Sequence, residues 1–274
     1  MSKLKSPNSF SSLVEARYRD GQSTSRSLPN HLPAALETIL THKSFRSFLP
    51  KSLPAGTLEA LLAAAQSGST SSMLQTWDVI AIQDPAHKSA AAKLAGDQDF
   101  IREAPLFLVF CANLNRAANI SRAHHQPALA LANMDMFLMA CIDAAIAAEA
   151  LGLGICYVGA VRNHAQQMCE LLNLPANTFA LFGMAVGVED TASYAEVKPR
   201  LPMGEVCHRE VWSEENQEGN VKAFDAALGS FYFQQLKLGR KSWSEFVAAN
   251  LASGEQDGRQ NVKDVLYKQS FKLE

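Results

Sequence analysis

The 274-residue chain lacks the short motifs that mark the common nucleotide-binding and metal-dependent enzymes. No GxGxxG follows an expected strand, which argues against a Rossmann dinucleotide site, and neither GxxxxGK[ST] nor HExxH occurs. A GxSxG nucleophile elbow is also absent. A Ser-His-Asp triad needs no sequence neighbours, so that alternative stays open. The sequence therefore names no catalytic residue and no metal ligand.

Cysteine is scarce, and charge is nearly balanced. The five cysteines form no CxxC pair. Cys111, Cys141 and Cys156 lie in apolar runs, where we expect buried free thiols and a cytoplasmic protein. A formal net charge of −2 and a pI of about 6.4 argue against broad nucleic-acid binding.

No hydrophobic run is free of charge. The most apolar stretch, Leu129–Leu153, contains Asp135, Asp143 and Glu149. Each acid near a bilayer centre would cost about 2.5–3.5 kcal/mol, so a buried or interface helix is favoured over a membrane helix. The serine-rich residues 1–31 contain no apolar run, and we expect no secretory signal there.

Apolar periodicity predicts an α+β protein with a central sheet flanked by helices. Three segments are expected: an N-terminal arm (1–31), a core (32–209) and a helical C-terminal extension (210–274). The expected strands are 79–82, 106–111, 155–158 and 181–188. Expected helices begin at Ser12 (with Glu15 at capping-box spacing), after Pro33, and at Pro54, Ala86, Ala128 and Trp243. Asn163 is expected to cap a helix that reaches Leu172, and Phe224, Leu228 and Phe231 have helical spacing.

One short segment concentrates groups that bind anions. His42, Lys43, Ser44 and Arg46 bring cations and a hydroxyl together within five residues. A phosphate carries about two negative charges and several acceptor oxygens, which such donors match. The alternative is a solvated basic face.

Three further segments could line the same ligand. Ser69–Gln75 offers hydroxyls and an amide, and the small residues of 152–160 allow close approach of a flat ligand to the backbone. Lys198-Pro199-Arg200 presents two cations around a residue with a fixed φ. The alternatives are an ordinary serine-rich loop, a strand with a tight turn, and a solvated loop.

Taken in order, these residues resemble the nitroreductase family of FMN-dependent oxidoreductases, and most of all its NADPH nitroreductase and flavin reductase branch. The resemblance covers about residues 37–209. It runs through His42–Arg46, Ser69–Gln75, Gly96–Gln98, Glu103–Cys111, Glu149–Gly154, Tyr157–Ala160 with Arg162-Asn163, and Lys198–Pro202.

The resemblance implies an intertwined homodimer with two FMN sites at the subunit interface. The FMN-binding residues that it implies are His42, Lys43, Ser44, Arg46, Thr70, Ser71, Gln98, Tyr157, Val158, Gly159, Ala160, Lys198 and Arg200. Lys43 stands where the family usually has Arg, which removes a planar, two-pronged donor. Lys237, Arg240 and Lys241 are candidates for the 2′-phosphate of NADPH, although the C-terminal segment matches only loosely.

The implied activity is hydride transfer from NADPH, or from NADH, to flavin N5, followed by reduction of a nitroaromatic, a quinone or a free flavin in a ping-pong cycle. The expected partners are a second copy of the chain and a small aromatic or quinone acceptor, with no nucleic acid and no membrane. Two alternatives remain: a flavin-binding redox sensor or store without turnover, and a structural dimer without a cofactor.

Overall fold

The computed structural model describes residues 9–19, 31–125, 136–193, 196–236, 242–254 and 257–271. The chain forms two compact units, each built from two stretches of sequence. One unit comprises residues 1–43 with 193–255, and the other comprises residues 44–192 with 256–274. We call them the helical unit and the sheet unit. The expected N-terminal arm, core and C-terminal extension divide the chain by sequence order, whereas these two units divide it by compactness. The three-segment division therefore stays a prediction.

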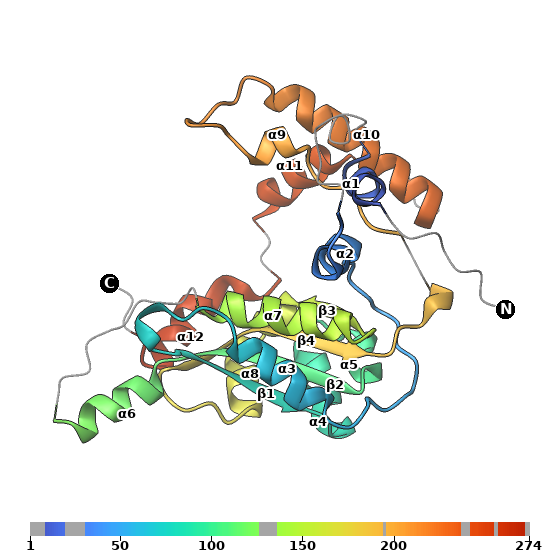
Figure 1. The fold of residues 1–274 in the computed structure, drawn as a ribbon. Coiled ribbons are helices and arrows are strands. Elements are labelled where there is room, and N and C mark those ends of the chain that lie inside the picture. Colours follow the sequence, from blue (N-terminus) through green and yellow to red (C-terminus); the bar gives the residue numbers. More distant parts are fainter. Residues whose placement is uncertain are drawn as a thin grey trace. The chain divides into compact units, whose positions relative to one another are not determined.

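The sheet unit is built on four antiparallel strands in the order β1-β2-β4-β3, which Figure 1 shows together. The central pair, β2 and β4, is almost entirely buried. The four expected strands are all present; the first three have slightly wider bounds, and the fourth begins three residues earlier and ends one residue earlier than expected. These bounds are β1 Trp77–Ile82, β2 Leu106–Asn113, β3 Gly154–Val158 and β4 Thr178–Gly187.

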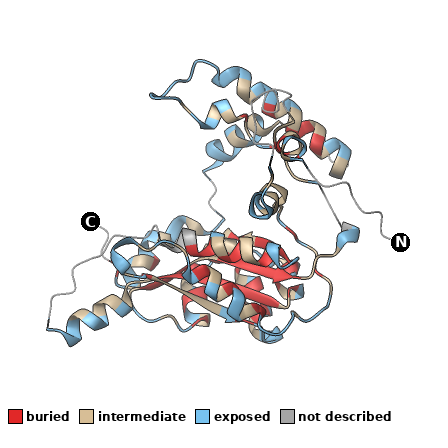
Figure 2. Ribbon diagram, viewed as in Figure 1, coloured by how far each residue is buried: buried red, intermediate tan, exposed pale blue. Residues whose placement is uncertain are grey.

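Both faces of the sheet are covered, which explains why β2 reads as a continuous apolar run. Side chains alternate between faces along a strand. Leu106, Leu108 and Phe110 accordingly pack into one core, and Phe107 and Val109 pack into the other. Figure 2 shows the buried residues gathered on these strands.

Helices of the sheet unit supply the rest of both cores. The core that contains Leu106 also contains Leu61 of α3 and Ala144 of α7. The core that contains Phe107 also contains helix residues, namely Ala91 of α4, Ile101 of α5 and Met168 of α8. The bounds are α3 Thr57–Gln66, α4 Pro85–Leu94, α5 Asp99–Glu103, α6 Asn115–Ala123, α7 Met136–Ala150, α8 Ala165–Leu171 and α12 Val262–Lys268. The expected start of the long apolar helix, at Ala128, lies outside the described residues.

The helical unit consists of α1 Phe10–Tyr18, α2 Ala34–Thr41, α9 Met203–Val206, α10 Gln217–Leu236 and α11 Trp243–Ser253. Phe224 of α10 and Trp243 of α11 meet edge to face, with ring centroids 5.3 Å apart. The helical spacing of Phe224, Leu228 and Phe231 correctly predicted α10, because all three are buried.

Three expected helix starts are wrong. The N-cap of α8 is His164 and not Asn163. The cap of α1 is Ser9, whose hydroxyl accepts from the Ser12 N–H, so Ser12 lies inside the helix and does not cap it. Helix α3 begins at Thr57 because Pro54 first enters a turn, where its carbonyl accepts from Thr57 and Gly56 takes φ +81°.

Burial makes four of the five cysteines poor nucleophiles. Cys111, Cys141, Cys156 and Cys169 are buried, whereas Cys207 is exposed. Loss of solvent raises the pKa of the Cys111 thiol to about 12 and that of Cys141 to about 11. Thiols react as thiolates, so these groups are chemically silent near neutral pH.

We predict that a chromogenic disulfide reagent near pH 8 titrates one thiol per folded chain rapidly, and all five in denaturant. Cys207→Ser should abolish the rapid phase without changing the thermal midpoint, because its side chain is exposed. Rapid reaction of any thiol in the folded Cys207→Ser variant would contradict the burial of the other four.

Candidate functional site

The outer edge of β3 carries free peptide groups in the sheet unit. The carbonyl of Ile155 points outward, because it accepts from the Phe45 N–H at 2.8 Å. Peptide groups two residues apart share an edge, so the Tyr157 N–H faces the same way. Extended backbone at Val158 (φ −125°, ψ 90°) continues this alternation to the Gly159 N–H. Among the described residues, no strand pairs with β3 beyond Ile155 on this edge.

Expected ligand-binding residues meet at the turn that follows β3. A Cβ placed on Gly96 would lie 3.7 Å from the Ala160 Cβ, 3.7 Å from the Gln98 Nε2 and 3.8 Å from the Asn163 Nδ2. Gln98 also donates to the Ala95 carbonyl at 2.9 Å. The structure thus brings Gln98 next to the turn Gly159–Arg162 (η3), with Gly96 allowing the approach.

Two arginines form hydrogen bonds at this turn. Arg162 donates to the Leu181 carbonyl of β4, and the Arg259 Nε donates to the Asn163 Oδ1 at 3.0 Å. Burial, and then the nearby Arg259 charge, lower the pKa of Arg162. The turn therefore lies in a positive field that favours an electron-rich ligand.

Tyr157 contributes its backbone to the edge, whereas its side chain belongs to the core. The hydroxyl donates to the Cys141 carbonyl of α7 at 3.0 Å, and the ring meets Phe182 edge to face. Burial raises the pKa of this phenol far above its usual range. The hydroxyl is therefore a structural hydrogen-bond donor to α7 and stays protonated near neutral pH.

The loop between α3 and β1 is held in an uncommon conformation. Ser72, Met73 and Gln75 all have φ between 47° and 55°, in the left-handed region. The Thr70 hydroxyl accepts from the Gln75 N–H at 3.2 Å, and Arg116 donates to the Gln75 carbonyl at 2.6 Å. Such backbone costs of order 1–3 kcal/mol per residue and gathers at binding loops.

This loop borders a cavity of about 450 Å³. Its charged lining residues are Asp78 of β1 and Arg116 of α6, which form an ion pair. The remaining lining is Leu62, Gln66, Gly68, Thr70, Met73, Leu74, Gln75, Trp77, Val79 and Ile120. Sequence analysis missed Arg116, because nothing in its local pattern marks a contact with Gln75, 41 residues away.

Two parts of the expected FMN-binding set lie at opposite edges of the sheet. The loop with Thr70 and Ser71 precedes β1, whereas Tyr157–Ala160 follow β3. Strands β2 and β4 separate these edges, a span of about 14 Å at the usual strand spacing. A ligand that contacted both segments of the same chain would have to span this separation.

The helical unit gathers the other expected cations. Arg17, which is 9% exposed, donates through Nη2 to the carbonyls of Leu40 at 2.8 Å and His42 at 2.9 Å. Its Nη1 lies 3.5 Å from the Lys198 carbonyl. The segments that carry His42-Lys43 and Lys198–Arg200 consequently meet on one arginine.

The cations themselves differ in exposure. Arg200 is exposed, and its guanidinium lies against the carbonyls of Lys198 and Pro199 at 3.4 and 3.2 Å. The Lys198 ammonium lies 5.5 Å from the centre of the Tyr232 ring of α10. In the sheet unit, Ser44 and Arg46 are both exposed.

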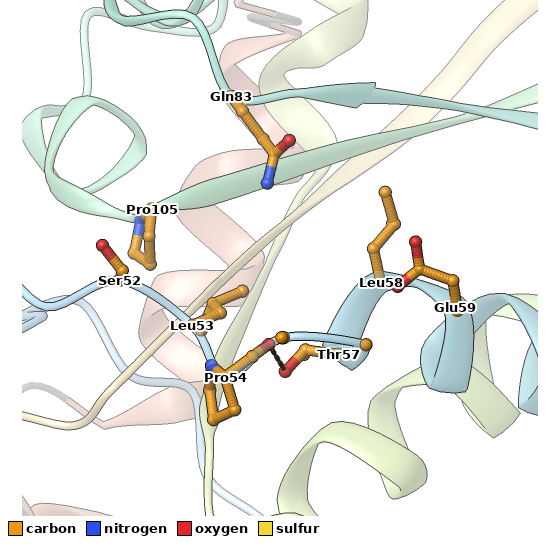
Figure 3. Close-up of a pocket in the computed structure, with 10 residues that line it drawn as sticks. Ser52, Leu53, Pro54, Thr57, Leu58, Glu59, Gln83 and Pro105 are labelled. Carbon is orange, nitrogen blue, oxygen red and sulfur yellow. Dashed lines mark hydrogen bonds between the residues drawn. The ribbon is translucent and has the colours of Figure 1, made fainter.

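A second cavity, of about 300 Å³, has a lining unsuited to an anion (Figure 3). It is bounded by residues 52–59, Gln83 and Pro105, and Glu59 is its one charged lining residue. Figure 3 shows the Thr57 hydroxyl turned to the Pro54 carbonyl, a bond of 2.7 Å.

Three further expectations concern the nicotinamide phosphate, metal ions and the membrane. Lys237, Arg240 and Lys241 lie outside the described residues. Within the described part of the chain, no three His, Cys, Asp or Glu side chains are placed to hold a metal ion. No described helix has the length and hydropathy needed to cross a bilayer.

Comparison with known proteins identifies the family. The nitroreductase family model matches residues 39–98 and 88–188, and the model of the C-terminal domain of that family matches residues 198–274. The chain belongs to the nitroreductase family. Neither model includes residues 1–38, so α1 lies outside the part that the family shares.

Named members of the nitroreductase family align over most of their lengths. A Bacillus subtilis FMN reductase (NADPH) is 35% identical over 224 residues, which cover 77% of this chain and 89% of that protein. A Salmonella typhimurium oxygen-insensitive NADPH nitroreductase is 32% identical, covering 86% of this chain and 97% of that protein. The structure of Vibrio harveyi NADPH:FMN oxidoreductase complexed with NAD+ superposes with a TM-score of 0.73 at 32% identity, covering 86% of this chain and 97% of that chain.

Proposed function

We propose that this nitroreductase-family protein is an FMN-dependent oxidoreductase that takes electrons from NAD(P)H. The observation that carries the proposal is the meeting of His42-Lys43 with Lys198–Arg200 in the helical unit. Two cationic segments, more than 150 residues apart in sequence, are held side by side there. A phosphate ester is the ligand that this concentration of donors suits.

The donors of each unit suit a different part of FMN. In our proposal, the helical unit supplies His42, Lys43, Lys198 and Arg200 for the phosphate. The sheet unit supplies Ser44 and Arg46 for the ribityl oxygens. It also supplies the edge N–H groups of Tyr157 and Gly159, with the Gln98 amide, for acceptor atoms of the ring.

FMN supplies the redox chemistry when bound, accepting a hydride from NAD(P)H at N5 and reducing a second substrate in turn. The protein's own residues bind and orient the flavin. The positive field of Arg162 and Arg259 behind the turn favours the electron-rich reduced ring. Because no side chain is needed as an acid or base, acceptors from several classes suit the site: nitroaromatics, quinones and free flavins.

The direct test is anaerobic mixing of the purified, yellow protein with NADPH and, separately, with NADH. We predict that the flavin absorbance bleaches within seconds and returns on addition of a quinone or a nitroaromatic. A preference for NADPH would appear as faster bleaching at equal cofactor concentration. Protein that binds FMN but does not bleach with either cofactor would instead be a flavin store or sensor.

We also propose that the protein forms a homodimer in which each flavin is bound by the β3 edge of one copy and by the loop before β1 of the other. Thr70 and Ser71 would then contact the FMN bound at β3 of a second copy. Exposed apolar side chains favour such an interface: Ile142 (49% exposed), Leu151 (55%), Met73 (72%) and Ile120 (55%).

Light scattering at micromolar concentration should accordingly find a dimer. Ile142→Glu should shift the protein toward monomer and lower its flavin content together, because each site would lose the partner's loop. The exposed Glu103→Gln serves as the control. A stable wild-type monomer that keeps FMN would contradict this arrangement.

Removing one phosphate cation should weaken FMN binding. We predict that Arg200→Ala raises the FMN dissociation constant roughly ten- to a hundredfold, because a lost charge-assisted hydrogen bond costs about 1.5–3 kcal/mol. Arg209→Ala, also exposed and in the helical unit, is the matched control and should bind normally. FMN retained equally by both variants on a desalting column would remove Arg200 from the site.

A further inference from the structure

The N-terminal helix α1 is a well-formed part of the helical unit, although it lies outside both family models. The Ser9 hydroxyl accepts from the Ser12 N–H, and the Ser12 hydroxyl accepts from the Ser9 N–H, both at 3.1 Å. This reciprocal pair fixes the start of the helix. Leu13 and Val14 are buried at 7% and 1% exposure, so one face of α1 is packed.

The far end of α1 is attached by charged side chains. Arg19 forms an ion pair with Glu196 at 2.7 Å, and its guanidinium lies 5.3 Å from the centre of the Phe231 ring. Glu196 is two residues before Lys198. Helix α1 is therefore held beside the segment that carries two of the proposed phosphate cations.

Arg17 connects that segment to the other pair of cations. Its guanidinium donates to the carbonyls of Leu40 and His42, which flank the end of α2, and reaches the Lys198 carbonyl. Its own main-chain carbonyl accepts from the Arg200 N–H at 2.9 Å. Four bonds thus run from one buried residue to the two segments of the proposed phosphate site.

On the side of the proposed phosphate site, these bonds use main-chain groups and not the binding side chains. The peptide groups involved belong to His42, Lys198 and Arg200 themselves. Cationic side chains on the two segments repel each other, so bonds from a third residue to the two backbones are needed to fix their separation. A planar guanidinium with several donors can bind carbonyls of both segments at once, which an ammonium does less well.

We propose that Arg17 is a positioning residue for the flavin phosphate, and that α1 is a clamp that sets the distance between His42-Lys43 and Lys198–Arg200. The proposal rests on the proposed function, because it assigns these four residues to FMN. It predicts a selective defect: loss of Arg17 weakens recognition of the phosphate and spares recognition of the ring.

Comparing riboflavin binding with FMN binding separates a positioning role of Arg17 from a general contribution of Arg17 to the stability of the protein. It has the same ring as FMN and lacks the phosphate, so the ratio of the two dissociation constants reports the phosphate site alone. The experiment titrates each flavin with the full-length, flavin-free protein and follows flavin fluorescence. The variants are Arg17→Met, Arg17→Lys and, as a control, Val14→Ala, which removes buried volume from the same helix.

We expect Arg17→Met to weaken FMN binding at least tenfold while riboflavin binding stays within threefold of wild type. Arg17→Lys should be intermediate and remains informative if Arg17→Met does not fold. Val14→Ala should lower the thermal midpoint without changing the ratio.

A ratio within threefold of wild type in both Arg17 variants would overturn the clamp, as would an equal loss of both flavins. A ratio that falls as far in Val14→Ala as in Arg17→Met would also overturn it, because packing alone would then explain the effect. Wild-type protein that binds FMN no more tightly than riboflavin would contradict the phosphate site itself, and the role of Arg17 with it.

Discussion

Repulsion between like charges is the constraint that shapes the proposed phosphate site. Two unit charges 4 Å apart at an effective dielectric constant of 20 repel by about 4 kcal/mol. Four cationic or potentially cationic side chains from two distant segments do not gather without a scaffold. The scaffold in this protein is main-chain hydrogen bonding: Arg17 and its carbonyl bind the peptide groups of Leu40, His42, Lys198 and Arg200. A bound phosphate then offsets the repulsion that remains.

Sheet order imposes the second constraint. Because β3 is an edge strand, the peptide groups of Tyr157 and Gly159 remain available to a ligand. Because β1 is the other edge strand, the strained loop at Thr70–Gln75 lies at the opposite edge from these peptide groups. The antiparallel order β1-β2-β4-β3 is therefore the physical basis for our proposal that a second copy supplies that loop to each site.

The sequence predicted the fold well wherever burial determined the pattern. The apolar run of β2 was recognisable because both faces of that strand are buried, and α10 was recognisable because Phe224, Leu228 and Phe231 share one face. Helix starts were less predictable. Ser9 and Ser12 offer the same capping chemistry, and Pro54 suits a turn as well as a first helical position. Local residue type therefore does not determine where these two helices begin, and packing does.

The proposed ligand-binding residues could be predicted from the sequence, whereas the arginines that hold their backbone in place could not. The cations at 42–46 and 198–200 were evident from residue type and order. Arg17 and Arg116 were not, because each acts through a carbonyl far away in sequence, 181 residues in the case of Arg17 and Lys198. A carbonyl is present at every residue, so no sequence pattern marks the one that an arginine will bind.

The central claim is that clustered cations bind the FMN phosphate, and phosphorus NMR of the flavin-loaded protein tests it most directly. A free phosphate monoester takes up its second proton near a pKa of about 6, which moves its resonance. Bound among these cations, the phosphate should stay dianionic, and we predict a resonance that does not change from about pH 5 to about pH 8. A bound phosphate that titrates like free FMN would contradict the account.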